Sequence, residues 1–108
     1  NDSRPDEWTN EEFFYADYLR LVRKMKNISD RVYLCYPIPP CGDKWKQRDG
    51  ILRKKVMKLI KRVSKEEKLP VIDLYREEMK NSINYFPDGI HPTSNGYDII
   101  AKSIYDNL

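Results

Sequence analysis

Two short apolar runs, separated by a long segment of helical periodicity, constrain the fold of this chain most strongly. Arg31–Tyr36 and Val71–Leu74 are rich in β-branched, aromatic and aliphatic residues, which is typical of buried strands. The basic segment between them, from about Arg48 to Glu67, repeats apolar residues at three- and four-residue steps and predicts an amphipathic helix. Strand, helix and strand in this order favour an alternating α/β fold.

Two further helices flank this unit. Thr9 or Asn10 can cap a helix from about Glu11 to Met25, because a side-chain oxygen there satisfies free amides of the first turn. The apolar stripe that predicts this helix, and that we assign to core packing, consists of Phe14, Tyr18, Leu21, Val22 and Met25. A terminal helix is predicted by a similar stripe, made of Tyr97, Ile100, Ala101 and Ile104. Ser94 is expected to belong to the cap of this last helix.

The segment Tyr75–Tyr85 predicts a short helix or a loop with one turn. No internal repeat is present in the sequence. Because two strands do not form a stable sheet alone, the chain needs further strands against which its own strands can pack. We therefore expect 108 residues to make up only part of a domain, which would be poorly stable alone or would assemble with a second copy or a complementary chain.

Composition and charge exclude several classes of protein. No apolar run approaches the roughly 20 residues that a membrane-spanning helix needs. The formal net charge of +3 comes largely from Lys44–Lys68, where the cations form the polar side of an amphipathic helix rather than a nucleic-acid-binding patch. The two cysteines, Cys35 and Cys41, are too few for a disulfide framework, and no Cys/His cluster has zinc-ligand spacing. We expect no metal, no organic cofactor and no nucleic-acid partner.

The only histidine lies in the loop before the terminal helix. Asp88 stands three residues before His91, Gly89 permits a turn that a Cβ would resist, and Pro92 stiffens the exit. Asp88 could accept a hydrogen bond from Nδ1 and leave Nε2 free to take a proton from a nucleophile. This would be the base half of a Ser-His-Asp arrangement. A surface or capping histidine is the alternative that spacing alone leaves open.

The run Asp88-Gly89-Ile90-His91-Pro92, followed by Gly96-Tyr97 and an apolar helix, resembles the C-terminal block of the SGNH (GDSL-type) hydrolases, a family of esterases and acylhydrolases. The opening Asn1-Asp2-Ser3-Arg4-Pro5 resembles the family's Gly-x-Asn-Asp motif, without its glycine. The resemblance implies that His91 is the catalytic base, that Asp88 orients it, and that the Asn1 side chain donates to the oxyanion. The family's Gly-Asp-Ser block and its oxyanion glycine have no counterpart among these residues.

The resemblance also implies a fold and a place within it. The family fold is a three-layer α/β/α sandwich of flavodoxin-like type around a mostly parallel sheet. Residues 1–108 would be the C-terminal part of a single domain, supplying its last strands and helices, and the nucleophilic serine would lie in the missing N-terminal part. The implied reaction is the hydrolysis of carboxylic esters by acyl transfer.

Some residues are candidate substrate contacts because of where they stand relative to a predicted strand or to Asn1. The loop Pro37–Trp45 comes after a strand, where open α/β sheets form their ligand crevice, so Pro39 and Trp45 are candidate contacts, with a plain rigid connector as the alternative. Trp8 could also line a cleft beside Asn1. The opening segment with Trp8 resembles carbohydrate esterases and sialate O-acetylesterase-like proteins, which implies an acetylated sugar as the ester substrate. A catalytically inactive carbohydrate-binding relative and a basic interaction module are the alternatives.

Overall fold

The structure is a computed structural model that describes residues 3–6, 8, 10–76, 79 and 84–108. Its first helix, α1 (Glu11–Ile28), begins where the sequence predicts and continues one turn past Met25. Asn10 is its N-cap, and the Asn10 side chain accepts a hydrogen bond from the Glu12 amide at 2.8 Å. Of the predicted apolar stripe only Val22 is fully buried, whereas Leu21 and Met25 are largely exposed. The capping residue therefore predicts the start of this helix correctly, whereas the apolar stripe does not predict which of its side chains are buried.

The two predicted strands pair in parallel. β1 (Leu34–Cys35) and β2 (Val71–Ile72) align Leu34 with Val71 and Cys35 with Ile72. Hydrogen bonds from the Leu34 amide to the Pro70 carbonyl and from the Tyr36 amide to the Ile72 carbonyl, each 2.9 Å long, extend the ladder. Both strands are shorter than the apolar runs that predict them, because residues outside this overlap have no paired neighbour on which to form a ladder.

A long helical segment crosses over between the strands, close to the predicted range. It consists of η1 (Asp43–Trp45), α2 (Lys46–Ile51), η2 (Leu52–Val56) and α3 (Met57–Glu67). η2 is a π-helical stretch, a widened turn that often marks functional sites in helices. α3 is followed by its C-cap Lys68, the one described non-glycine residue with a positive φ.

The core lies between α1, β1 and the crossover helices. Its buried members come from all of these elements: Val22, Leu34, Leu52, Val56, Ile60 and Val63. Ion pairs at the surface bridge α1 to the crossover segment, with Lys55 3.1 Å from Glu11 and Arg23 3.0 Å from Glu67. Lys55 of the basic segment is thus paired with an acidic side chain of α1.

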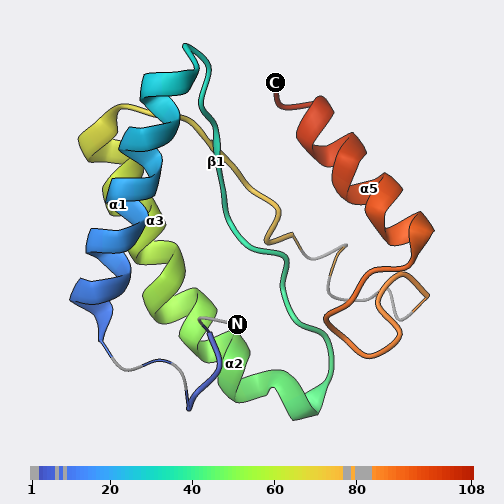
Figure 1. Cartoon of the computed structure of the whole chain (residues 1–108). Coiled ribbons are helices and arrows are strands. Elements are labelled where there is room, and N and C mark those ends of the chain that lie inside the picture. The colour runs from blue at the N-terminus through green and yellow to red at the C-terminus, as the bar shows by residue number, and fades with distance from the viewer. Residues whose placement is uncertain (1–2, 7, 9, 77–78, 80–83) are drawn as a thin grey trace.

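The terminal helix α5 (Ser94–Tyr105) lies across the strands from the α1–α3 pair (Figure 1). Its N-cap is Thr93, whose side chain accepts from the Gly96 amide at 3.2 Å, so the prediction that Ser94 belongs to the cap is wrong. Tyr97, a member of the predicted apolar stripe, is 62% exposed, whereas Ile100 and Ile104 are half-buried. Residues 77–78 and 80–83 of the predicted Tyr75–Tyr85 turn lie outside the described residues.

None of the helices in the described ranges combines the length and apolarity that crossing a bilayer requires.

Candidate active site

His91 and Asp88 form a hydrogen-bonded pair in the loop that leads into α5. Nδ1 of His91 lies 2.6 Å from Oδ2 of Asp88. The other carboxylate oxygen, Oδ1, accepts the backbone N–H groups of Ile90 at 2.9 Å and His91 at 2.8 Å. The carboxylate is thus fixed by its own loop and leaves Oδ2 aimed at the imidazole. Among the described residues Nε2 has no hydrogen-bond partner, and the imidazole is 78% exposed.

This loop is held against the segment that follows β1. The indole N–H of Trp45 donates to the Asp88 carbonyl at 2.8 Å, and the Cys41 amide donates to the Gly89 carbonyl at 2.8 Å. Gly89 has φ +90°, and a Cβ there would lie 2.1 Å from the Cys41 carbonyl oxygen. The position therefore requires glycine both for its conformation and for the close approach of the two loops.

The other side of the loop is anchored at the start of α5. The Thr93 amide donates to the Tyr85 carbonyl at 2.8 Å, and buried Gly96 packs so closely that a Cβ would lie 2.6 Å from that same oxygen. Phe86, 1% exposed, accepts from the Gly89 amide through its backbone carbonyl. The Gly96 of the recognised motif therefore serves packing, and it fixes the distance between α5 and the His91 loop.

The surroundings of Asp88 favour the ionised form of its carboxyl group. The His91 side chain, together with the backbone N–H groups of His91 and Ile90, holds the pKa of Asp88 well below its usual range. An ionised Asp88 favours the imidazole tautomer with its proton on Nδ1, which exposes the Nε2 lone pair. The pair can therefore take a proton from a nucleophile that approaches Nε2, and it can stabilise the imidazolium that results.

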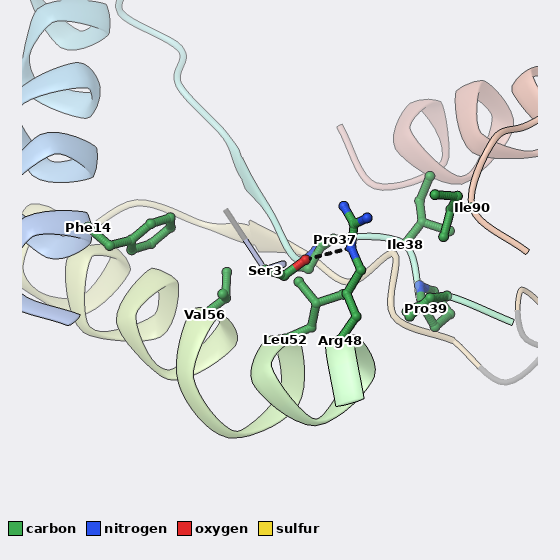
Figure 2. Close-up of a pocket in the computed structure, with 10 residues that line it drawn as sticks. Ser3, Phe14, Pro37, Ile38, Pro39, Arg48, Leu52, Val56 and Ile90 are labelled. Atoms are coloured by element: carbon green, nitrogen blue, oxygen red, sulfur yellow. Dashed lines mark hydrogen bonds between the residues drawn. The ribbon is translucent and has the colours of Figure 1, made fainter. Parts of the chain in front are cut away.

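A pocket of about 260 Å³ lies next to this loop and is shown in Figure 2. Its walls come from five parts of the chain: the opening segment, α1, the loop after β1, the crossover helices with η2, and the His91 loop. Ile90 closes it from the His91 loop, although His91 itself is not among the lining residues. The lining residues are Ser3, Phe14, Pro37, Ile38, Pro39, Pro40, Arg48, Leu52, Val56 and Ile90.

The candidate contacts named from the sequence fall in different places. Pro39 is fully buried and lines the pocket, as part of the predicted Pro37–Trp45 wall. Trp45 lies beside the His91 loop, with its indole N–H engaged by Asp88. Trp8 packs on Phe14 with 5.4 Å between ring centroids, at the edge of the core. Asn1, the predicted oxyanion donor, lies outside the described residues.

Two residues of the pocket escaped the sequence analysis. Nε of Arg48 donates to Oγ of Ser3 at 2.9 Å, and Ser3 is only 4% exposed (Figure 2). In the sequence Arg48 is one cation among many on an amphipathic helix, and its position at the pocket depends on where the opening segment lies. Within the described ranges no three His, Cys, Asp or Glu side chains converge in a way that could hold a metal ion.

Comparison with known proteins identifies the family. The structure places an acid–histidine pair on a loop beside a parallel strand–helix–strand unit. Residues 1–99 match the GDSL-like Lipase/Acylhydrolase family, and the chain belongs to this family. No curated protein and no solved structure gives a significant match. The family is one of lipases and acylhydrolases, which indicates ester hydrolysis as the kind of activity.

Proposed function

We propose that this chain carries the base and the orienting acid of a serine ester hydrolase. The observation that carries the proposal is the 2.6 Å contact between His91 Nδ1 and Asp88 Oδ2, with Nε2 left open. His91 would take the proton of a serine Oγ as that oxygen attacks the ester carbonyl, and would pass it to the leaving alcohol. It would then take a proton from the water that attacks the acyl-enzyme, and would return that proton to the serine Oγ as the acid is released.

The nucleophilic serine comes from outside these 108 residues, because no Gly-Asp-Ser block occurs among them. We further propose that the chain is the C-terminal part of one three-layer α/β/α domain. The parallel β1–β2 pair, with α1 and α3 on one side in Figure 1 and α5 on the other, supports this arrangement. In the complete domain the Asn1 side chain would donate to the oxyanion of the tetrahedral intermediate, an interaction worth about 3–4 kcal/mol in hydrolases.

The pocket favours a short acyl group or another compact part of the ester. Its volume of about 260 Å³ is below the roughly 300–1,000 Å³ of sites that enclose drug-sized ligands. Most of its lining is apolar, which suits the methyl group of an acetyl ester, and its small volume disfavours a long chain. Together with the resemblance of the opening segment to carbohydrate esterases, this supports an acetylated sugar as the substrate.

The proposal is tested with a chromogenic acetyl ester and the complete protein. His91→Ala should lower kcat/KM by about 10²–10⁴-fold, the usual contribution of a general base, while the fold is kept because the imidazole is exposed. Lys102→Ala, which removes an exposed α5 side chain far along the helix, is the matched control and should keep wild-type turnover. Undiminished turnover by His91→Ala would reject the proposal. No turnover by either wild type or His91→Ala would favour a binding protein without catalysis.

A further inference from the structure

Arg48 is the one charged residue among the described side chains that line the pocket beside the His91 loop. It projects from α2 between the opening segment and Pro37–Ile38, and in Figure 2 its terminal nitrogens point away from the helix. Most of the other lining residues are aliphatic, aromatic or proline. Arg48 is half-buried, so its charge lies at the boundary between this apolar lining and water.

No carboxylate compensates it within the part of the chain that the structure describes. Nε donates to the neutral hydroxyl of Ser3, and the guanidinium carbon lies 5.8 Å from the centroid of the Trp45 ring. Arg53, one turn further along the helical segment, instead pairs with Asp49 at 3.1 Å. The guanidinium of Arg48 carries five N–H donors, of which the contact with Ser3 uses one.

The surroundings of Arg48 add positive charge. Arg48 also lines a neighbouring surface hollow, together with Lys44 and Trp45. Nζ of Lys44 lies 5.0 Å from the centroid of the Trp45 ring, so both cations lie near the same indole. The acid in this hollow, Asp6, is already paired with Arg4 at 3.0 Å. An anion bound at Arg48 would therefore lie near two cations.

The ligand that fits such a guanidinium is a carboxylate, which accepts two parallel N–H donors. The pocket is continuous with the catalytic loop through Ile90, whose own N–H binds Asp88. We propose that Arg48 binds a carboxylate of the substrate, so that the hydrolase prefers anionic esters over neutral ones. This inference rests on the proposed function, and it concerns the substrate class of the same site.

The carboxylate could stand on either side of the ester bond, and two matched substrate pairs separate these cases. Mono(4-nitrophenyl) succinate against 4-nitrophenyl butyrate tests a charge on the acyl side. The second pair, 4-acetoxybenzoate against 4-acetoxybenzamide, tests a charge on the alcohol side. In each pair we measure the ratio of kcat/KM for the anionic to the neutral ester, with the complete hydrolase. This ratio cancels effects of a substitution on catalysis itself.

Arg48→Gln should lower this ratio by about 10- to 100-fold in one of the two pairs, the range for a hydrogen bond to a charged group. The pair that responds identifies the side that carries the carboxylate. Arg48→Lys keeps the charge and should recover part of the preference. Lys54→Gln, which removes an exposed cation from the same helical segment, should leave the ratio unchanged. An unchanged ratio in both pairs for Arg48→Gln, or an equal loss in Lys54→Gln, would overturn the inference.

Failure of the proposed function gives a different result. If wild type hydrolyses none of the four esters, ester hydrolysis is rejected, and the role of Arg48 is decided by titration calorimetry with succinate and 4-hydroxybenzoate. Binding of either anion that Arg48→Gln abolishes and Lys54→Gln retains would support a carboxylate site. Absence of binding, or binding that both variants retain, would overturn it.

Discussion

Replacing Gly89 by alanine should disrupt the loop that carries Asp88 and His91. Gly89 has φ +90°, and an added Cβ would lie 2.1 Å from the Cys41 carbonyl oxygen and 2.7 Å from the Trp45 indole nitrogen. The carbonyl belongs to the backbone and cannot rotate out of the way. Relief therefore requires that the two loops separate, which breaks the bonds from the Cys41 amide to Gly89 and from the Trp45 indole to Asp88.

The magnitude follows from these two effects. A left-handed conformation costs a residue with a Cβ about 1–2 kcal/mol. Each of the two hydrogen bonds contributes about 0.5–1.5 kcal/mol net. We therefore expect Gly89→Ala to lower the free energy of unfolding by about 2–5 kcal/mol. Since a whole domain is stable by only about 5–15 kcal/mol, this is a large fraction.

Two other glycines supply matched controls for urea unfolding followed by circular dichroism. Gly42 has φ +98° but no atom within 4 Å of an added Cβ, so Gly42→Ala isolates the conformational cost and should lose about 1–2 kcal/mol. Gly50 lies in α2 with open space around it, and Gly50→Ala should gain about 0.5–1 kcal/mol. Equal losses for Gly89→Ala and Gly42→Ala would refute the close approach between the two loops.

Two further predictions concern the same loop. Trp45→Phe removes the donor to the Asp88 carbonyl but keeps an aromatic ring. It should therefore lower kcat while KM stays within about twofold. A raised KM with unchanged kcat would instead make Trp45 a substrate contact. The lowered pKa of Asp88 means that its ionised form stabilises the fold above the ordinary aspartate pKa of about 4, and that this contribution is lost as pH falls towards the lower folded value. The melting temperature of wild type should therefore exceed that of Asp88→Asn at pH 6, and the gap should narrow below pH 4; a constant gap from pH 7 to pH 3 would show that the charge of Asp88 contributes nothing.

The sequence predicts those features of the structure best that depend on contacts between residues close together in the chain. Asn10 caps α1 through a contact two residues away, and the Asp88–His91 contact spans three residues. Spacing predicts the cap, and it permits the Asp88–His91 contact while leaving a surface or capping histidine as the alternative. The ends of the strands could not be inferred in this way, because they depend on how far Leu34–Cys35 and Val71–Ile72 overlap once the helices between them are packed.

Long-range contacts account for what the sequence left open. The bond from Trp45 to Asp88 joins residues 43 positions apart, and the bond from Arg48 to Ser3 joins residues 45 apart. No periodicity or motif encodes either contact. Tyr97 illustrates this as well, since it belongs to the apolar stripe that predicts α5 but its side chain is 62% exposed. Periodicity indicates which face of a helix is apolar, and the neighbouring elements decide whether that face is covered.

The most direct test of the proposed His91–Asp88 pair is a long-range ¹H–¹⁵N correlation spectrum of this chain, which contains a single histidine. At pH 8, where an ordinary imidazole is neutral, we predict a proton on Nδ1, an unprotonated Nε2, and a downfield Nδ1 proton that disappears in Asp88→Asn. If wild type and Asp88→Asn both show the averaged tautomers of a free histidine, the hydrogen bond between His91 and Asp88 is contradicted. The role of His91 as the base in the proposed hydrolysis would then be contradicted as well.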